Sequence, residues 1–451
     1  MRLSRLRNVH FVGIGGIGMS GIAEVLLTLG FAVSGSDLKA SAVTQRLAER
    51  GARIAVGHSA ANVTGAQVLV YSSAVSQENP ELAEAHRLGI PVIPRAEMLA
   101  ELMRMKSAIA VAGSHGKTTV TAMVAHLAHA AGLDPTVVIG GRLSTLGTSA
   151  RLGKGDLMVA EADESDRSFL KLYPAIAVMT NIDREHLENY GGFDDLQQAF
   201  VDFANRVPFY GAVVACVDDP HVAAIVPKIT RRVRTYGLDA NADISARDVE
   251  LGPFTARATV DGHGELRLNV PGRHNLQNAL AAVSVGLELG LPFATVASGL
   301  AEFRGAERRF EVKGEPNGIL VVDDYGHHPT EIAAVIAAAK TLKRRIVIAF
   351  QPHRYTRTAA LMDAFGPSLA GADHIVLTDI YSAGEDALPG ITIEALADEV
   401  RRSTKAPVDV VKRVEDVAGA LAKIAKRGDV VLTLGAGSIG SIGGHVVDAL
   451  S

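Results

Sequence analysis

Cysteine is nearly absent from this sequence, and long apolar runs and an excess of either charge are missing. The single cysteine, Cys216, cannot form an internal disulfide, so nothing implies an oxidising compartment. No stretch approaches the roughly 20 apolar residues of a membrane-spanning helix. The N-terminal arginines are followed almost at once by glycines, which argues against a signal peptide. We therefore expect a soluble cytoplasmic protein without a membrane partner.

The charge balance is close to neutral, with 45 Lys and Arg residues against 49 Asp and Glu residues and a formal net charge of −4. A nucleic-acid-binding domain is usually strongly basic, so we expect no nucleic-acid partner, although a local basic cleft for phosphate groups is compatible with this balance. The 451 residues are too many for one ordinary core, and this length favours about three domains.

Short apolar runs alternate with helical patterns along the chain. Strands are predicted at Val9–Val12, Phe31–Ser34, Val68–Tyr71, Pro91–Ile93, Ala108–Ala112, Leu157–Ala160, Ile176–Thr180, Ala212–Cys216, Ile319–Asp323, Arg345–Phe350, His374–Thr378 and Asp429–Leu434. Helices are predicted at Met19–Leu29, Val43–Arg50, Pro80–Leu88, Thr118–Ala131, Leu276–Leu289, Glu331–Lys340 and Ile393–Arg402. The stretch from about Ala240 to Val270 has the period-two pattern of antiparallel strands. This alternation is typical of α/β domains whose parallel sheets are covered by helices on both faces.

A glycine-containing turn follows the predicted strand Ala108–Ala112 and opens a predicted helix. Its residues are Gly113, Ser114, His115, Gly116, Lys117, Thr118 and Thr119. Glycines let backbone N–H groups at a helix N-terminus converge on an anion, a lysine can meet the outer phosphates, and a hydroxyl group can ligate Mg²⁺. Val111 stands where the common nucleotide-binding motif has its leading glycine, so that match is incomplete. The alternative is a plain strand-to-helix turn with an incidental lysine.

A second glycine loop lies near the N-terminus, directly after the strand Val9–Val12. Its glycines are Gly13, Gly15, Gly16 and Gly18, and Asp37 follows the next strand. This spacing is typical of a dinucleotide-binding loop with a carboxylate for a ribose hydroxyl. Because such a loop recognises a pyrophosphate, NAD and a UDP-sugar both fit it, and a tight turn without a ligand is the structural alternative.

Acidic side chains follow a strand of the second run of elements. The segment from Glu161 to Asp166 holds four carboxylates, and a bound cation would relieve their repulsion. Glu161, which comes first after the strand, is our candidate Mg²⁺ ligand, and a solvated acidic loop is the alternative. Asp183 and His186 follow the next strand and add a carboxylate and an imidazole at a comparable strand end.

Further polar clusters come later in the chain. Asn275 opens a predicted helix, where it would cap the helix or face a nucleotide. The segments Asp323–Pro329 and Gln351–Arg357 each follow a strand, so we expect both on one rim of a parallel sheet, where such sheets bind ligands. Arg354 and Arg357 are suited to clamping a carboxylate or phosphate, and a solvated loop is again the alternative.

Taken together, these motifs resemble those of the bacterial Mur ligases. The matching segments are Gly13–Gly18, Gly113–Thr119, Glu161–Asp166, Thr180–His186, His274–Asn278, Arg308–Phe310, Asp323–Pro329, Gln351–Arg357 and Gly435–Gly440. Each motif is modestly specific, but their order and spacing are highly specific, and the likeness spans nearly the whole chain. The shortened phosphate loop is a variant found in this family. The first loop is more similar to that of the alanine-adding member than to that of the member that recycles a tripeptide.

The resemblance implies three α/β domains. These are a Rossmann-like UDP-sugar-binding domain at residues 1–106, a central P-loop ATPase-like domain with an added antiparallel section at residues 107–312, and a Rossmann-like amino-acid-binding domain at residues 313–451. It implies an enzyme that uses ATP and Mg²⁺ to join L-alanine to the carboxylate of UDP-N-acetylmuramate. The reaction would pass through an acyl phosphate and serve cytoplasmic peptidoglycan precursor synthesis.

The resemblance also implies roles for individual residues. Those implied for catalysis are Lys117, His186 and Arg354, and those implied for metal binding are Thr118, Glu161 and His186. Those implied for ATP binding are Gly113–Thr119, Asn275 and Arg309. Those implied for the UDP-sugar are Gly13, Gly15, Gly16, Gly18, Asp37, Ser72 and Ser73. Those implied for the amino acid and substrate side are Tyr325, His327, Arg354 and Arg357.

Two other classes of protein compete with this interpretation. An NAD-dependent oxidoreductase would use the first glycine loop, but it leaves Gly113–Thr119 without a purpose. A nucleotide-dependent switch or transporter subunit would use the second loop, but it leaves His327, Arg354 and Arg357 without a purpose. The sequence leaves open the choice among alanine, glycine and serine, and the oligomeric state.

Overall fold

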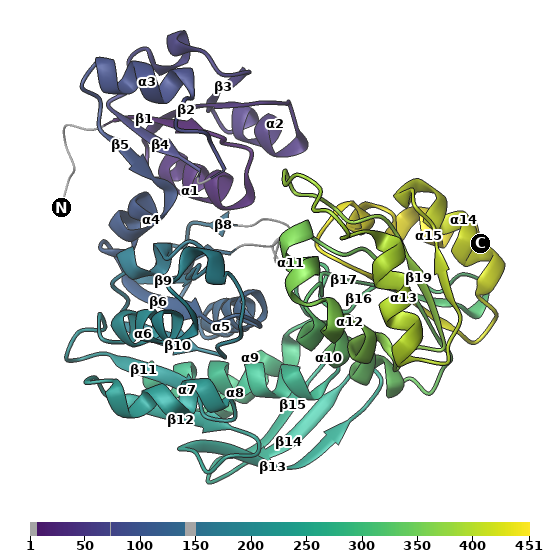
Figure 1. The fold of residues 1–451 in the computed structure, drawn as a ribbon. Coiled ribbons are helices and arrows are strands. Elements are labelled where there is room, and N and C mark those ends of the chain that lie inside the picture. Colours follow the sequence, from purple (N-terminus) through teal and green to yellow (C-terminus); the bar gives the residue numbers. More distant parts are fainter. Residues whose placement is uncertain (1–6, 73, 140–149) are drawn as a thin grey trace. The chain divides into compact units, whose positions relative to one another are not determined.

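The computed structural model describes residues 7–72, 74–139 and 150–451, which form three sheets (Figure 1). The backbone divides into two compact units. The first unit comprises Met1–Arg247, Thr259–Glu265 and Gln277–Glu302, and the second comprises Asp248–Ala258, Leu266–Leu276 and Phe303–Ser451. Strands and helices alternate in both units, so the predicted α/β class is confirmed.

The first sheet is parallel and has the strand order β3-β2-β1-β4-β5. Its strands are β1 (Asn8–Val12), β2 (Ala32–Asp37), β3 (Arg53–Val56), β4 (Val68–Tyr71) and β5 (Val92–Pro94), and its helices are α1 (Ile17–Thr28), α2 (Ala42–Glu49), α3 (Pro80–Arg87) and α4 (Arg95–Met103). Because β1 pairs with both β2 and β4, the strand order reverses at β1. Ligands of open parallel sheets bind beyond the strand ends at such a point, which is where the first glycine loop lies.

The second sheet has ten strands in the order β15-β14-β13-β12-β11-β10-β6-β9-β7-β8. The strands are β6 (Ser107–Ala112), β7 (Thr136–Val138), β8 (Ala150–Arg151), β9 (Leu157–Glu161), β10 (Ile176–Met179), β11 (Ala212–Cys216), β12 (Val233–Gly237), β13 (Ile244–Leu251), β14 (Ala256–Val260) and β15 (Gly264–Leu268). The helices are α5 (Lys117–Ala130), α6 (Phe193–Ala204), α7 (Pro220–Ile225), α8 (Arg273–Glu288) and α9 (Phe293–Glu302). The central strands β6, β10 and β11 are buried along nearly their whole length, which explains their continuous apolar sequences.

The third sheet has the order β16-β17-β21-β18-β19-β20, and all its strands are parallel except β16. The strands are β16 (Glu311–Gly314), β17 (Leu320–Asp324), β18 (Ile346–Phe350), β19 (His374–Leu377), β20 (Val408–Val410) and β21 (Val430–Leu434). The helices are α10 (Pro329–Lys340), α11 (Tyr355–Ala360), α12 (Met362–Leu369), α13 (Ile393–Ser403), α14 (Val417–Ile424) and α15 (Gly443–Leu450). One core contains side chains of α10, α12 and α13, and a separate core contains side chains of α14 and α15.

The predicted strands and helices are present, with ends that shift by a few residues. The helix predicted from Met19 begins at Ile17, inside the glycine loop, because Gly16 is its N-cap. The strands β13, β14 and β15 are consecutive neighbours joined by short connections, in agreement with the predicted antiparallel section. The elements that were not predicted are the strands β3, β7, β8, β12, β16 and β20 and the helices α4, α6, α7, α9, α11, α12, α14 and α15. In the described part of the chain, no helix has the length and apolar character needed to cross a membrane.

Candidate functional site

The phosphate loop Gly113–Thr119 follows β6 and opens α5, as predicted. Its two glycines adopt positive φ angles, 139° at Gly113 and 83° at Gly116. A Cβ atom at Gly113 would lie 2.0 Å from Thr180 Oγ1, and one at Gly116 would lie 2.7 Å from Asn278 Oδ1. Both positions therefore require glycine for conformation and for space. The close approach also brings Asn278, on α8, into contact with the loop.

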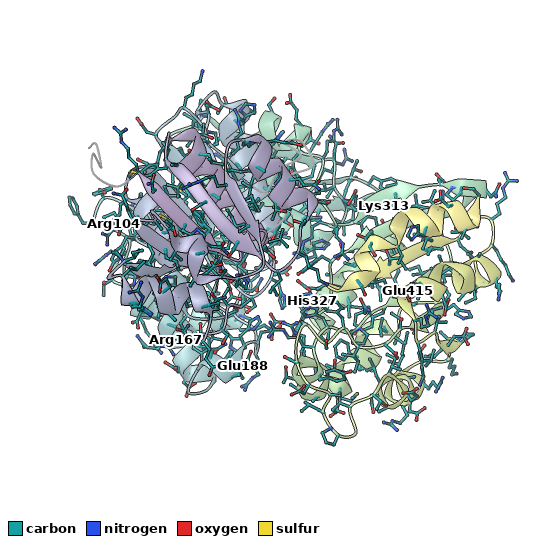
Figure 2. All side chains as sticks on the ribbon, turned by 90° about the horizontal axis from the view of Figure 1, so that it is seen from above. Arg104, Arg167, Glu188, Lys313, His327 and Glu415 are labelled. Atoms are coloured by element: carbon teal, nitrogen blue, oxygen red, sulfur yellow. The ribbon has the colours of Figure 1, made fainter. Side chains whose placement is uncertain are left out.

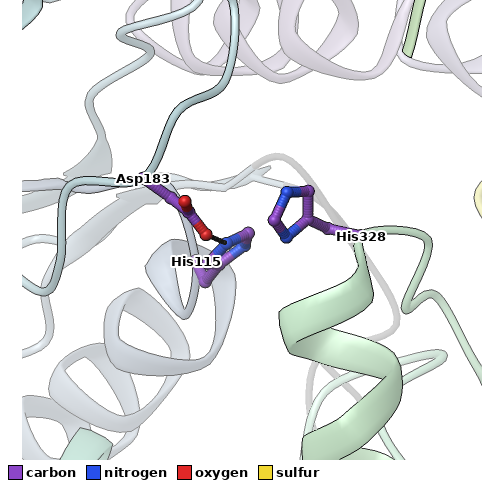
Figure 3. A group of neighbouring side chains, drawn as sticks. All are labelled: His115, Asp183 and His328. Atoms are coloured by element: carbon purple, nitrogen blue, oxygen red, sulfur yellow. Dashed lines mark hydrogen bonds and ion pairs between the residues drawn. The ribbon is translucent and has the colours of Figure 1, made fainter. Parts of the chain in front are cut away.

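The loop is held from one side by the segment that follows β10. The Ser114 backbone N–H donates to the Asn181 carbonyl oxygen at 3.0 Å, and the His115 N–H donates to Asn181 Oδ1 at 2.7 Å. Thr180 Oγ1 donates to the His115 carbonyl oxygen at 2.6 Å. The Asp183 N–H donates to Ser114 Oγ at 2.8 Å, and the carboxylate of Asp183 lies 3.0 Å from His115 Nε2 (Figure 3). These bonds fix the curl of the loop before any ligand binds.

Lys117 is largely buried and points back into the loop. Its Nζ donates to the Gly113 carbonyl oxygen at 2.6 Å and to Glu164 Oε1 at 2.9 Å. Burial acts to lower the pKa of Lys117, but the negative charges of Glu164, Asp163 and Glu161 outweigh burial and raise it. Lys117 therefore places a fixed positive charge at the N-terminus of a helix, and this arrangement favours the binding of phosphate groups.

The acidic segment after β9 lies beside this lysine. Strand register pairs Glu161 with Val111, two residues before the loop. Burial raises the pKa of Glu164 to about 7, and among the described residues its Oε2 atom has no hydrogen-bond partner. The Tyr190 hydroxyl donates to the carbonyl oxygen of Glu164 and so fixes the segment. A buried carboxylate oxygen without a donor, next to further carboxylates, fits a nearby divalent cation, because Mg²⁺ prefers hard oxygen ligands.

Of the predicted metal ligands, Thr118 lies in the first turn of α5 and Glu161 ends β9. His186 has a positive φ of 56°, and its side chain is 19% exposed. A non-glycine residue in this conformation is strained, and such strain is often found at functional sites. The three residues thus lie at the ends of three neighbouring parallel strands of the second sheet, β10, β6 and β9.

The first glycine loop is held by the last residues of β2. The N–H groups of Gly13 and Ile14 both donate to the Ser36 carbonyl oxygen, at 2.9 and 3.0 Å. The Gly15 N–H donates to Asp37 Oδ2 at 2.8 Å. A Cβ atom at Gly15 would lie at the same distance, 2.8 Å, from that oxygen, so glycine is required there. Asp37, predicted as a ribose ligand, thus has one carboxylate oxygen engaged with the loop.

The buried carboxylate of Glu81 supports the segment that holds the first glycine loop. Glu81, on α3, is fully buried and accepts hydrogen bonds from Ser36 Oγ at 2.7 Å and Asn62 Nδ2 at 2.6 Å. His10 Nε2 lies 3.0 Å from the same carboxylate, and the Ser59 N–H donates to it at 3.1 Å. Burial acts to raise the pKa of Glu81, but these donors outweigh it and lower the pKa to about 2. The sequence analysis did not identify this network.

The remaining predictions for the first loop concern Gly16, Gly18 and two serines. Gly16 is the N-cap of α1 and Gly18 lies in its first turn. Ser72 lies beside the loop, since a Cβ atom at Gly13 would be 3.5 Å from the Ser72 Cβ. Ser73 falls outside the described residues. The structure therefore places all the described residues predicted for the UDP-sugar at the carboxyl ends of three neighbouring strands of the first sheet, β2, β1 and β4.

In the second unit, polar and aromatic side chains gather at the ends of β17 and β18. The ring centroids of Tyr325 and His327 lie 5.4 Å apart, and those of His327 and His353 lie 5.6 Å apart. His353 stacks on Tyr381 with a centroid distance of 5.5 Å. Arg357 Nη1 lies 3.2 Å from His353 Nδ1. Burial first, and then the positive charges around it, lower the pKa of His353 to about 3, so the ring is neutral and accepts this hydrogen bond.

Arg354 lies on the same rim and has a strained backbone. Its φ of 70° and ψ of 140° are rare for a residue with a side chain, and its N–H donates to the Tyr381 carbonyl oxygen at 2.8 Å. The side chain is 42% exposed and lies 3.8 Å from Glu385. The four residues predicted for the amino acid side are therefore together on one rim. His353 and Tyr381, which complete the cluster, were missed, although His353 lies inside the motif Gln351–Arg357.

Asn275 and Arg309, both predicted to bind the nucleotide, belong to the second unit. Asn275 does not cap α8, which begins at Arg273; its Nδ2 donates to the Pro271 carbonyl oxygen at 2.7 Å. The Arg309 guanidinium lies 5.2 Å from the Tyr325 ring centroid. Their assignment to the nucleotide stays a prediction. Asn181, Glu164 and Asn278 contact the phosphate loop, but they were not among the predicted site residues.

Comparison with known proteins identifies relatives along the whole chain. Three domain descriptions match in order: "Mur ligase family, catalytic domain" at residues 8–107, "Mur ligase middle domain" at residues 111–286 and "Mur ligase, glutamate ligase domain" at residues 308–437. A UDP-N-acetylmuramate–L-alanine ligase of Geobacter sp. (strain M21) is 54% identical over 446 residues, covering 97% of this chain and 96% of that protein. The enzyme of the same name from Solibacter usitatus (strain Ellin6076) is 53% identical over 452 residues, covering 99% and 96%.

A solved structure shows the same fold. The crystal structure of the UDP-N-acetylmuramate–alanine ligase from Thermotoga maritima superimposes with a TM-score of 0.84 at 30% sequence identity. The similarity covers 98% of this chain and 98% of that chain. The fold expected from the sequence motifs, with its three α/β domains, is therefore confirmed.

Proposed function

The chain belongs to the Mur ligase family, and on that premise we propose that it joins L-alanine to the carboxylate of UDP-N-acetylmuramate with conversion of ATP to ADP and phosphate. Relatives named for this reaction share more than half of their residues with it over nearly the full chain. The single structural observation that carries the proposal is the phosphate loop with Lys117 held among carboxylates at the sheet end. A turn that only connects a strand to a helix does not require a buried lysine paired with carboxylates.

The chemistry explains why ATP is required. A carboxylate is a poor electrophile, so the γ-phosphoryl group of ATP is transferred to a carboxylate oxygen, ADP leaves, and an acyl phosphate forms. The amine of L-alanine then attacks the carbonyl carbon, the bond to phosphate breaks, and the amine loses its proton as the amide forms. Lys117 stabilises the charge on the transferred group, and the loop amides hold the phosphates in place.

We also propose which part of the chain binds each substrate. We assign residues 1–106 to the UDP-sugar, residues 107–312 to ATP and residues 313–451 to the amino acid. The Gly13–Gly18 loop takes the diphosphate, with Ser72 beside it and Asp37 Oδ1 directed to the ribose. Arg354 and Arg357 bind the alanine carboxylate, and Tyr325 and His327 form the wall next to it. Asn275 and Arg309 are assigned to the nucleotide.

A divalent cation belongs to the same proposal. Thr118, Glu161 and His186 would hold Mg²⁺, which would supply positive charge at the phosphate oxygens when bound. The donor set fits, because residues with hydroxyl, carboxylate and imidazole groups follow or end the adjacent strands β6, β9 and β10, and Glu164 Oε2 lies buried without a donor among the described residues. We place the reaction in the cytoplasm, where ATP and nucleotide sugars are available, as a step in peptidoglycan precursor synthesis.

The test combines a substrate panel with an isotope label. ADP release should require UDP-N-acetylmuramate together with an amino acid, with L-alanine preferred over glycine and L-serine. With oxygen-18 in the muramyl carboxylate, one labelled oxygen should appear in the released phosphate. NADH formation without ADP, or ATP turnover that is indifferent to the amino acid, would contradict the proposal in favour of an oxidoreductase or a nucleotide switch.

A further inference from the structure

Two basic segments precede neighbouring strands of the third sheet. The segment Lys343–Arg345 leads into β18 and the segment Lys423–Arg427 leads into β21, and these two strands pair in parallel. The segments lie side by side, since Arg345 Nη1 is 3.5 Å from the Ile424 carbonyl oxygen. They therefore form one basic patch at the amino ends of the strands. Its six cations are Lys343, Arg344, Arg345, Lys423, Lys426 and Arg427.

Most of the positive charge of the basic patch is not neutralised. Arg344 pairs with Glu315 at 2.7 Å, and Arg345 pairs with Asp429 at 2.8 Å. Asp373 adds a further carboxylate at this edge, where it accepts a hydrogen bond from the backbone of β18. The four remaining cations are exposed and form no ion pair with any residue that the structure describes; they are Lys343, Lys423, Lys426 and Arg427. The patch thus offers four accessible positive charges on a chain whose net charge is −4.

An exposed apolar turn lies beside the basic patch. The turn between β13 and β14 contains Leu251 and Phe254, and each of these residues is 41% exposed. The carbonyl oxygen of Gly252 in this turn accepts a hydrogen bond from Thr341 Oγ1 at 3.2 Å, and Thr341 is two residues from Lys343. Both parts belong to the second unit. Large apolar side chains at the tip of a hairpin, next to unpaired lysines, indicate a binding surface, because burial elsewhere in the fold would have been more favourable for them.

We propose that the basic patch and the β13–β14 turn bind an anionic phospholipid surface. Lysine and arginine side chains are attracted to anionic headgroups, and an aromatic side chain is stable at the boundary between headgroups and acyl chains. Tyr325 and Arg354 lie at the carboxyl ends of β17 and β18, at the opposite edge of the same sheet. The rim proposed for the amino acid therefore stays accessible while the patch is on the lipid.

The sequence analysis expected no membrane partner, and the structure shows why this surface was missed. That expectation rested on the lack of long apolar runs, which concerns membrane-spanning helices and not binding to a lipid surface. The two basic segments are far apart in the sequence and meet only because β18 and β21 are neighbours. The apolar turn is more distant still and reaches the patch through Thr341.

A basic surface can also bind nucleic acid, so the two partners have to be distinguished. Proteins that bind single strands place aromatic rings along a basic groove, so that successive bases stack on them. In the β13–β14 turn the ring of Phe254 is accompanied by the aliphatic side chain of Leu251. An aliphatic side chain has no face on which a base can stack, whereas it is compatible with acyl chains. The observations therefore favour a lipid surface.

The experiment measures co-sedimentation of the full chain with lipid vesicles. The chain should bind vesicles of phosphatidylglycerol mixed with phosphatidylcholine, should not bind pure phosphatidylcholine, and should be released by high salt. Lys343→Gln combined with Lys426→Gln should weaken binding about thirtyfold, because each lysine near an anionic surface contributes about fivefold. Phe254→Ala should weaken binding about fivefold, because it removes apolar area from the boundary region.

The matched control removes the same number of positive charges at the opposite edge of the sheet. Lys412 and Arg413 follow β20, are 65% and 73% exposed, and pair with Glu394 and Glu415; Glu415 is labelled in Figure 2. Lys412→Gln combined with Arg413→Gln should bind the mixed vesicles within about twofold of the unsubstituted chain, since general charge effects are small for screened surface groups.

Four results overturn the inference: no binding to the mixed vesicles, equal binding to both kinds of vesicle, an equal loss in the control double variant, or an unchanged affinity in Phe254→Ala. Tighter binding to a single-stranded oligonucleotide than to the mixed vesicles would also overturn it, in favour of nucleic acid. Thermal unfolding of each variant accompanies the binding data. If Phe254→Ala does not fold, Leu251→Gln takes its place, and an unchanged affinity in that variant counts against the lipid surface.

Discussion

The two glycine loops of this chain are built alike and held differently. Both connect a parallel strand to a helix, yet the Gly13–Gly18 loop has its amides bound by Ser36 and Asp37 and has no cation of its own. The Gly113–Thr119 loop carries Lys117, which is surrounded by carboxylates. Under the proposed function, the first loop is a rigid binding site for a ligand that is bound but not cleaved there. Under the same proposal, Lys117 gives the second loop the positive charge that stabilises a phosphoryl group during transfer.

The largest expected effect comes from removing the charge that distinguishes the second loop. Lys117→Ala should lower the rate of ligation by about a thousandfold or more, because a positioned positive charge at a transferring phosphoryl group is worth several kcal/mol. Binding of UDP-N-acetylmuramate should be unchanged. ADP release and direct binding of the UDP-sugar measure the two effects. Near-normal ligation by this variant would exclude Lys117 from the chemistry.

A steric change tests how tightly the second loop is held. Gly113→Ala places a Cβ atom 2.0 Å from Thr180 Oγ1, so we expect loss of ATP binding and a fall in the free energy of unfolding of about 3 kcal/mol. Gly132→Ala is the control, because Gly132 also has a positive φ, of 78°, but has nothing within 4 Å of its Cβ position. It should cost only about 1 kcal/mol. Equal losses in the two variants would show that backbone strain, and not the contact with Thr180, sets the requirement for glycine.

Binding of the UDP-sugar at the first loop should depend on the buried carboxylate of Glu81. Glu81→Gln removes the charge that binds the Ser36 hydroxyl, and the Ser36 carbonyl holds the loop amides. We expect the KM for UDP-N-acetylmuramate to rise about tenfold while the KM for ATP and kcat stay unchanged. Ser36→Ala should reproduce this pattern without removing a buried charge. Glu84→Gln, at a partly exposed residue of the same helix that is paired with Arg87, should have no effect, and parallel changes in both KM values would argue for a general loss of stability.

The buried Glu81 carboxylate should also give the protein a pH-dependent stability. The pKa of Glu81 is lowered from 4.5 to about 2 in the folded protein, so its contribution is fully present above pH 4.5 and is lost as the pH falls toward 2. The shift corresponds to about 3 kcal/mol at neutral pH. Denaturant unfolding of the unsubstituted chain and of Glu81→Gln should therefore differ most above pH 5 and converge near pH 2. A difference that stays constant over this range would mean that Glu81 is not ionised in the folded state.

The sequence predicted the loops well because their signals are local. A strand, a run of glycines and a helix are consecutive in the chain, and each rests on short-range backbone physics. The strand ends carrying Glu161, His186 and Arg354 were predicted for the same reason. Helix α4 was missed because it follows a proline with no side-chain cap at its start, and most of its residues are buried. Its apolar face is too broad for a clear helical period.

The supports of the loops could not be predicted because they act across long sequence separations. Glu81, on α3, binds Ser36 at the end of β2, and Arg95, on α4, packs against Gly18. Asn278, on α8, contacts Gly116 although the two residues are far apart in the sequence. In the sequence, Glu81 is one of two glutamates on an amphipathic helix, and nothing local marks it as fully buried. Such contacts depend on the packing of strands and helices against one another, which composition and spacing do not encode.

The most direct test of the difference between the loops is a paired equilibrium binding measurement. UDP-N-acetylmuramate and ATP are titrated separately into the unsubstituted chain, Lys117→Ala and Glu81→Gln. The account predicts that each substitution weakens one ligand only. Lys117→Ala should abolish ATP binding and leave the affinity for the UDP-sugar unchanged, whereas Glu81→Gln should lower the affinity for the UDP-sugar and leave that for ATP unchanged. If either substitution weakens both ligands equally, the two loops do not serve separate nucleotides and the account is contradicted.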